Sequence, residues 1–235
     1  MQERLISYSE GDDSFDALVV TPDGDGDKPA VLVCHAWGGR DDFAENKARK
    51  LAELGYVAAA IDVYGVGVRG TDTESCAALM TPLLENADVL RRRLAAAFQA
   101  VRTAEGVDPD RMGAIGFCFG GLCSLLMARM GLPMSGVVSF HGLLKVGEPL
   151  ESKPRARMCV LHGQDDPMVP PDDVGAWAAE MKRIGADWQL HAYPNTVHAF
   201  TVPEANDPDF GTVYNAEADA RSWATMKAFL AETLA

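Results

Sequence analysis

RMGAIGFCFGG, residues 111–121, joins a short apolar run to a helical pattern through the sequence G-x-C-x-G-G. The run 111–118 has the pattern of a strand, and GLCSLLMARMG (121–131) predicts a helix that follows at once and ends at Gly131. A direct change from strand to helix requires a sharp turn, in which glycines remove the side chains that would clash. The turn pushes its central side chain, Cys118, out of the sheet.

Cys118 has two interpretations. A free cysteine is most often a buried packing residue, which behaves as a small hydrophobe. In this turn, however, the start of the helix places backbone N–H groups and a partial positive charge beside the sulfur. Such surroundings lower the pKa of a thiol and favour the reactive thiolate. The turn therefore favours Cys118 as a nucleophile.

Segments rich in β-branched residues alternate with helical patterns on both sides of this turn, which indicates an α/β fold with a mainly parallel sheet. We expect residues 4–9 and 15–22 to form an antiparallel edge, and the glycine-rich stretch 65–75 to be a loop that covers a site. No linker divides the chain, so one domain over residues 1–235, with about seven or eight strands, is expected. The other expected strands are 29–36, 56–65, 135–142, 157–166 and 187–194, and the other expected helices are 42–54, 84–101, 172–185 and 215–234.

The chain has 34 acidic and 21 basic residues, so its net charge of −13 repels nucleic acid and anionic lipid, and neither is expected as a partner. Five cysteines without C-x-x-C spacing suit reduced thiols better than disulfides or a zinc site. No apolar run reaches the roughly 18 residues of a membrane span, and the first residues lack the pattern of an export signal. We therefore expect a cytoplasmic protein without a metal.

A nucleophile needs a base, and the base needs an orienting carboxylate. The acidic pair Asp165–Asp166 ends one expected strand, and His198 follows the last one. Nucleophile, acid and histidine occur in this order in α/β-hydrolases, where each lies in a loop after a strand. His198 is therefore the expected base. The other histidines are expected to shape the pocket, bind loops or face the sheet: His35, His141, His162 and His191.

Three motifs resemble the dienelactone hydrolase family, the cysteine members of the α/β-hydrolase fold that include carboxymethylenebutenolidase-like enzymes. They are G-x-C-x-G-G at 116–121, H-G-x-x-D-x-x-V-P at 162–170 and H-A-F at 198–200. The resemblance extends from about residue 15 to the C-terminus. Within H-G-x-x-D-x-x-V, the acid is Asp166 rather than Asp165. The residue after the nucleophile, Phe119, is expected to supply one oxyanion N–H group, and by resemblance Trp37 supplies the other.

Two positions depart from the family pattern. Ala36 stands where the family carries a glutamate that helps to form the thiolate, so Cys118 is expected to be activated directly by His198 as a thiolate–imidazolium pair. Val202 stands where the type enzyme carries an arginine for the substrate carboxylate, although Arg69 lies near the region of a second such arginine. An anionic lactone is therefore not the favoured substrate.

These features predict a single-domain α/β-hydrolase that cleaves a carboxylic ester or lactone through Cys118, Asp166 and His198 and a thioester acyl-enzyme. No metal or organic cofactor is required, and either a monomer or a homodimer is compatible with the sequence. The alternative is a non-catalytic member of the fold that binds a small molecule or a protein through the same pocket. A peptidase ranks below both.

Overall fold

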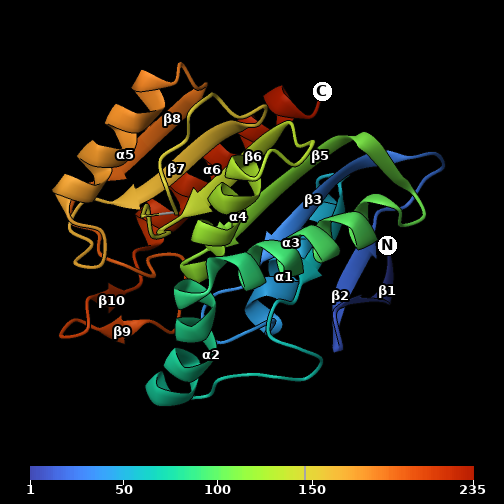
Figure 1. Ribbon diagram of the computed structural model, residues 1–235, viewed down its shortest axis with the longest axis horizontal. Coiled ribbons are helices and arrows are strands. Elements are labelled where there is room, and N and C mark those ends of the chain that lie inside the picture. Colours follow the sequence, from blue (N-terminus) through green and yellow to red (C-terminus); the bar gives the residue numbers. More distant parts are fainter. Residues whose placement is uncertain (146) are drawn as a thin grey trace.

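Eight strands form one sheet in the order β1-β2-β4-β3-β5-β6-β7-β8 in the computed structural model, which describes residues 1–145 and 147–235 (Figure 1). β1 and β2 pair antiparallel, β2 is antiparallel to β4, and the remaining pairs are parallel. The strands are β1 (Gln2–Glu10), β2 (Asp13–Thr21), β3 (Lys28–Cys34), β4 (Val57–Ile61), β5 (Val107–Phe117), β6 (Gly136–Phe140), β7 (Arg157–Gly163) and β8 (Trp188–Tyr193).

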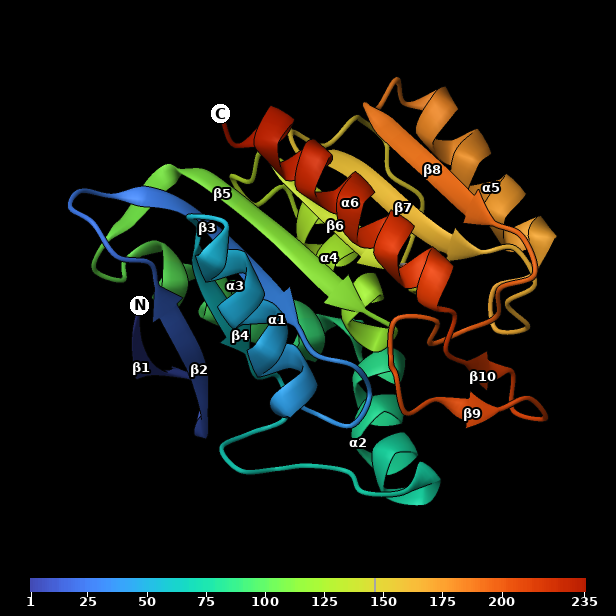
Figure 2. The ribbon, with the colours of Figure 1, turned by 180° about the vertical axis from the view of Figure 1, so that it is seen from behind.

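Helices cover both faces of the sheet. α3 (Ala87–Arg102), α4 (Phe119–Arg129) and α5 (Pro171–Arg183) pack on the face seen in Figure 1, where their buried side chains join one apolar cluster. α1 (Asp42–Glu53) and α6 (Ala216–Thr233) pack on the opposite face, seen in Figure 2, where they enclose the second cluster. The sheet is therefore the middle of three layers, as its continuous apolar strands predict.

The register of the parallel strands brings several strand ends to one edge. Cys34 pairs with Gly116, and Phe117 pairs with Phe140, which in turn pairs with Leu161. The residues that follow β3, β5, β6 and β7 therefore lie close together, although they are far apart in the chain. This is the edge at which ligands bind in open parallel sheets.

The mostly parallel sheet and the antiparallel edge formed by β1 and β2 are confirmed, and the helix expected at 84–101 corresponds to α3, but the predicted end of the loop 65–75 and start of that helix are wrong. A further helix, α2 (Thr73–Glu85), begins within the expected loop 65–75 and includes the first residues of the helix expected at 84–101. Asp72 caps it by accepting the Ser75 N–H at 2.8 Å, and the Ser75 hydroxyl accepts the Asp72 N–H. Asn86, with φ −118° and ψ 73°, then separates α2 from α3.

A short hairpin, β9 (Asn206–Asp207) and β10 (Thr212–Val213), was also not predicted, because two-residue strands carry no periodic pattern. It lies between β8 and α6 in the chain, and beside α2 in both views (Figures 1 and 2). No described helix is long and apolar enough to cross a membrane.

Glycines allow α4 to begin directly at the end of β5. A Cβ atom on Gly116 would lie 1.8 Å from the carbonyl oxygen of Gly120, and one on Gly120 would lie 2.1 Å from the carbonyl oxygen of Cys34. These neighbours are backbone atoms, which cannot move aside without displacing β3 or α4. The close approach of α4 to β5 therefore requires glycine at position 116, and its close approach to β3 requires glycine at position 120.

Replacement of Gly120 by alanine is expected to destabilise the protein by about 3 kcal/mol or more, because overpacking against rigid backbone cannot relax as it does in a flexible core. Urea unfolding measures the change. Gly175→Ala is the matched control, since this glycine is an exposed residue of α5 whose added Cβ would meet nothing within 4 Å. It should stabilise by about 0.5–1 kcal/mol; equal effects of the two substitutions would contradict the argument.

Candidate active site

Cys118 lies at the tip of the turn between β5 and α4. Its φ of 55° and ψ of −116° are values that a side-chain-bearing residue rarely adopts. The Cys118 N–H donates to the carbonyl oxygen of Phe140 at 3.0 Å and to Nδ1 of His141 at 3.1 Å. Contacts with the end of β6 thus hold the strained backbone, and the thiol projects from the carboxyl edge of the sheet.

Asp166 and His198 meet in the buried interior of this edge. Nδ1 of His198 lies 2.7 Å from Oδ2 of Asp166, and their side chains are 2% and 0% exposed. The second carboxylate oxygen accepts the Met168 N–H at 2.8 Å. Asp165 is exposed, and its N–H donates to the carbonyl oxygen of Thr196. The structure therefore brings Asp166, and not its neighbour, to the histidine.

The unpredicted hairpin holds the backbone of His198. The His198 N–H donates to the carbonyl oxygen of Gly211 at 3.0 Å, and its carbonyl oxygen accepts the Val213 N–H at 3.2 Å. Ala199, the next residue, has a φ of 57°, a left-handed conformation that is uncommon for alanine. β9 and β10 are therefore part of the scaffold that orients the imidazole.

Cys118 and His198 affect each other's ionisation. Burial raises the pKa of the Cys118 thiol, but the charge and proximity of His198 and the N–H groups of Phe119 and Trp37 outweigh it, so the pKa falls below its usual value. Burial lowers the pKa of His198, but Cys118 and Asp166 raise it overall. Nε2 of His198 is buried and has no hydrogen-bond partner in the described chain, which leaves it available to a reacting group. These directions favour a thiolate–imidazolium pair.

The other four cysteines show what burial does without such a partner. Burial raises the pKa of Cys34 and of Cys159 to about 12, and it raises the pKa of Cys76 and Cys123 as well. Cys118 is the one cysteine of the five, all within the described residues, whose pKa is lowered. Its environment is therefore that of a reactive thiol rather than of a packing residue.

Two backbone N–H groups face the sulfur, from the two positions expected to form the oxyanion hole. Phe119 begins α4, and Trp37 lies in the loop after β3; hydrogen bonds from both lower the pKa of the thiol. A carbonyl carbon attacked by the sulfur would carry its oxygen into the same region. The two donors are therefore placed to stabilise negative charge that develops there.

The remaining histidines do not contact the acid. Burial, together with the charge of His198, lowers the pKa of His141 well below its usual value, and its Nε2 lies 2.8 Å from the Thr201 hydroxyl. His141 therefore supports the turn as a neutral acceptor for the Cys118 N–H. His35 binds the loop after β3, whereas His191 lies within β8 and contacts Gln189. No hydrogen bond of the His162 side chain occurs among the described residues, and burial lowers its pKa.

A cavity of about 550 Å³ opens onto Cys118 and His198. Trp37 and Phe210 stack at 5.9 Å on one of its walls, and Cys76 and Met80 of α2 contribute to another. The walls thus include α2 and the hairpin, the two elements that were not predicted. The capping sequence D-T-E-S was the signal for α2, but its third residue after the cap is serine rather than the usual glutamate or glutamine.

The lining of this cavity carries aspartates but no lysine or arginine in the described chain. The aspartates are Asp41, Asp72 and Asp207. Ala36 and Val202 are both lining residues, so the two departures from the family pattern lie in the site itself. Arg69 is outside the lining, and its guanidinium donates to the carbonyl oxygen of Val68 at 2.6 Å.

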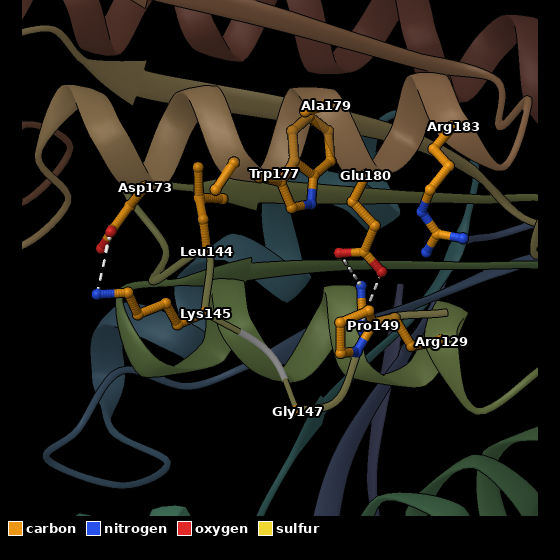
Figure 3. Close-up of a pocket in the computed structure, with 11 residues that line it drawn as sticks. Arg129, Leu144, Lys145, Gly147, Pro149, Asp173, Trp177, Ala179, Glu180 and Arg183 are labelled. Atoms are coloured by element: carbon orange, nitrogen blue, oxygen red, sulfur yellow. Dashed lines mark hydrogen bonds and ion pairs between the residues drawn. The ribbon is translucent and has the colours of Figure 1, made fainter. Parts of the chain in front are cut away.

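A second cavity, of about 440 Å³, lies between α4, α5 and the loop after β6 (Figure 3). Its charged groups are engaged with one another or with the loop: Arg129 with Glu180 at 3.0 Å and Lys145 with Asp173 at 3.0 Å. None of Cys118, Asp166 and His198 lines it. These ion pairs fasten the loop to the helices, and the cavity is separate from the candidate site. No cluster of three potential metal ligands occurs in residues 1–145 and 147–235.

A mostly parallel eight-stranded sheet, helices on both faces and a glycine-flanked turn after β5 define an α/β-hydrolase. The model of the dienelactone hydrolase family matches residues 15–234. The chain therefore belongs to the dienelactone hydrolase family, and it is an ester or lactone hydrolase.

Known proteins support this assignment. The chain is similar to the crystal structure of P91, a dienelactone hydrolase-like promiscuous phosphotriesterase from metagenomic libraries, with a TM-score of 0.90 and 32% identity over 100% of this chain and 99% of that one. Protein K02A2.1 of Caenorhabditis elegans is 39% identical over 150 residues, which cover 62% of this chain and 95% of that protein. Protein usf of Aquifex pyrophilus is 24% identical over 236 residues, which cover 98% of this chain and 99% of that protein.

Replacement of His198 by alanine is expected to raise the pKa of Cys118 above its usual value, because burial is then opposed only by the two N–H groups. In the unsubstituted protein the lowered pKa lets the thiolate form at a lower pH than for an ordinary thiol, and alkylation slows as pH falls through that pKa. The rate of reaction with iodoacetamide as a function of pH, followed by mass spectrometry of the Cys118 peptide, measures the pKa of Cys118 in the unsubstituted protein and in the variant. His191→Ala is the control and should leave the profile unchanged; an unchanged profile in the His198 variant would refute the pairing.

Proposed function

We propose that the protein hydrolyses uncharged carboxylic esters or lactones through Cys118, His198 and Asp166, with a thioester acyl-enzyme. The observation that carries the proposal is the buried imidazole of His198. Its Nδ1 contacts Asp166 at 2.7 Å, its Nε2 has no hydrogen-bond partner in the described chain, and the charges of Cys118 and Asp166 raise its pKa. This arrangement supplies a nucleophile, a proton carrier and an orienting carboxylate in one place.

In the first half of the reaction, the Cys118 thiolate attacks the acyl carbon and forms a carbon–sulfur bond. The carbonyl oxygen becomes an oxyanion, which the N–H groups of Phe119 and Trp37 stabilise. As the tetrahedral intermediate collapses, the carbon–oxygen bond to the leaving group breaks, and protonated His198 gives its Nε2 proton to the departing alkoxide. The products are an alcohol and a thioester on Cys118; for a lactone, both remain in one molecule.

In the second half, neutral His198 removes a proton from a water molecule, which attacks the thioester carbon. The second tetrahedral intermediate uses the same two N–H donors. Its collapse releases the carboxylic acid and the Cys118 thiolate, with His198 again protonated. Asp166 accepts the Nδ1–H throughout, which keeps Nε2 directed at the reacting atoms and stabilises the imidazolium.

The charge of the cavity supports an uncharged substrate. A carboxylate-bearing lactone would enter a space lined by three aspartates and by no lysine or arginine of the described chain. It would also approach the Cys118 thiolate, and like charges in a poorly solvated site repel strongly. An uncharged ester or lactone avoids both costs. The similar protein P91 is a phosphotriesterase, and phosphotriesters are likewise uncharged.

Replacement of Cys118 by alanine is expected to abolish the hydrolysis of an uncharged activated ester such as p-nitrophenyl acetate. Asp166→Asn should lower kcat by about a hundredfold or more, because general acid–base catalysis contributes about 10²–10⁴-fold and the histidine loses its orienting charge. Asp165→Asn, at the exposed neighbour, is the matched control and should retain the rate. Turnover by the Cys118 variant at the original rate would refute the mechanism.

Replacement of Val202 by arginine is expected to raise kcat/KM for a carboxylate-bearing lactone by about ten- to a hundredfold, because a charged hydrogen bond contributes about 1.5–3 kcal/mol. Val202→Met, of similar length but uncharged, is the control and should not change it. The original protein should prefer uncharged substrates in the same assay. A preference for the anionic lactone before any substitution would contradict the role given to the cavity's charge.

A further inference from the structure

The Trp37 N–H group belongs to a loop and not to a helix, so its direction needs separate support. Phe119 is held by α4, whereas the peptide that joins Ala36 to Trp37 follows the end of β3. A peptide unit is planar and trans, so its N–H and its C=O point in nearly opposite directions. Whatever holds the carbonyl oxygen of Ala36 therefore also sets where the Trp37 N–H points.

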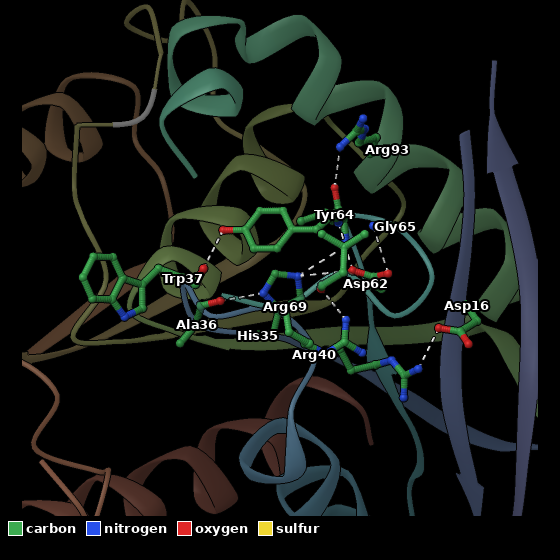
Figure 4. A network of polar contacts seen from close by, with 12 residues as sticks. Asp16, His35, Ala36, Trp37, Arg40, Asp62, Tyr64, Gly65, Arg69 and Arg93 are labelled. Atoms are coloured by element: carbon green, nitrogen blue, oxygen red, sulfur yellow. Dashed lines mark hydrogen bonds and ion pairs between the residues drawn. The ribbon is translucent and has the colours of Figure 1, made fainter. Parts of the chain in front are cut away.

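His35 holds that carbonyl oxygen. Its Nδ1 lies 2.6 Å from the oxygen of Ala36, and its Nε2 accepts the Val63 N–H at 3.3 Å (Figure 4). A carbonyl can only accept and an N–H can only donate, so these partners require a neutral imidazole with its hydrogen on Nδ1. The side chain is buried, and burial lowers the pKa of His35 to about 4, so the ring stays neutral. Gly39 N–H also donates to the same oxygen, at 3.2 Å.

Tyr64 holds the other side of Trp37. Its hydroxyl donates to the carbonyl oxygen of Trp37 at 3.0 Å (Figure 4). Its ring stacks on Phe119 with centroids 5.9 Å apart. The one side chain thus contacts both residues whose N–H groups face the sulfur. It also lies against His35, at 4.8 Å between ring centroids.

Asp62 fixes the position of Tyr64 at the end of β4. Its fully buried carboxylate accepts the Tyr64 N–H at 2.9 Å and the Gly65 N–H at 3.1 Å. The nearer carboxylate oxygen is 3.8 Å from Nε2 of His35, too far for a hydrogen bond. The carboxylate therefore serves the turn after β4, and His35 and Tyr64 both reach from fixed strand ends to the Trp37 loop.

We propose that His35 and Tyr64 are positioning residues that aim the Trp37 N–H at the reacting oxygen by holding the two carbonyl groups on either side of it. The inference rests on the proposed function for its effect on turnover. Neither side chain touches the substrate. Because the same N–H faces the Cys118 sulfur in the resting protein, a misdirected peptide also loses a hydrogen bond to the thiolate.

Three variants test the proposal: His35→Leu removes the donor, His35→Asn retains an amide nitrogen where Nδ1 stands, and Tyr64→Phe removes one oxygen atom. His35→Leu is expected to lower kcat for p-nitrophenyl acetate by about tenfold or more, with KM within about twofold, because a displaced donor affects the transition state more than substrate binding. It should also raise the pKa of Cys118 in the iodoacetamide profile. His35→Asn should restore most of the lost kcat and most of the original pKa of Cys118. Tyr64→Phe should lower kcat and raise that pKa, as His35→Leu does.

His191→Ala and Tyr214→Phe are matched controls, since His191 contacts Gln189 and Tyr214 contacts Asp219, and both should retain kcat and the alkylation profile. A folded His35→Leu variant with the original kcat and profile would overturn the proposal, and so would an Asn variant as impaired as the Leu variant. If His35→Leu does not fold, Tyr64→Phe decides in the same way. Failure of the proposed function is recognised separately, because Cys118→Ala would then still hydrolyse the ester. The alkylation profile tests the orientation of the Trp37 N–H group without turnover.

Discussion

The negative charge of a partly buried Cys118 thiolate must be stabilised by neighbouring groups, and much of the site follows from this requirement. Burial alone drives a thiol to stay protonated, as the raised pKa values of Cys34 and Cys159 show. With alanine at position 36, the charge that offsets burial comes chiefly from His198, assisted by two backbone N–H groups. Asp166 must then be buried too, because an exposed carboxylate would neither orient nor charge that imidazole as strongly.

Three histidines at this edge of the sheet show how the same burial leads to different charges. Burial lowers the pKa of each, but His198 lies between two groups that become negative, whereas His35 and His141 face backbone or hydroxyl partners. His198 is therefore protonated, whereas His35 and His141 stay neutral and bind backbone groups. Histidine thus serves both as a candidate proton carrier and as a support for the backbone. The groups that contact each imidazole determine which of these roles it has.

The sequence predicted the parts of the fold that repeat a local pattern. Apolar strands and glycines at the turn identified β5, α4 and the position of Cys118 at the tip of the turn, and the spacing from His162 distinguished Asp166 from Asp165. The contacts that hold the Trp37 loop were not predictable from the sequence, since the contact between His35 and Ala36 depends on one rotamer and on β4 lying beside β3. The hairpin was missed for a similar reason: its two-residue strands form through pairing and not through periodicity.

The walls of the cavity and the activation of the thiol are governed by the same electrostatics. An anion bound beside Cys118 would raise the pKa of the thiol and return it to the unreactive form, unless a cation nearby offset the added charge. The lining places Asp41, Asp72 and Asp207 around the cavity and Val202 where an arginine could stand. An uncharged substrate leaves the balance between Cys118 and His198 undisturbed. A site that forms its thiolate through a single imidazole is for this reason best matched to substrates without charge.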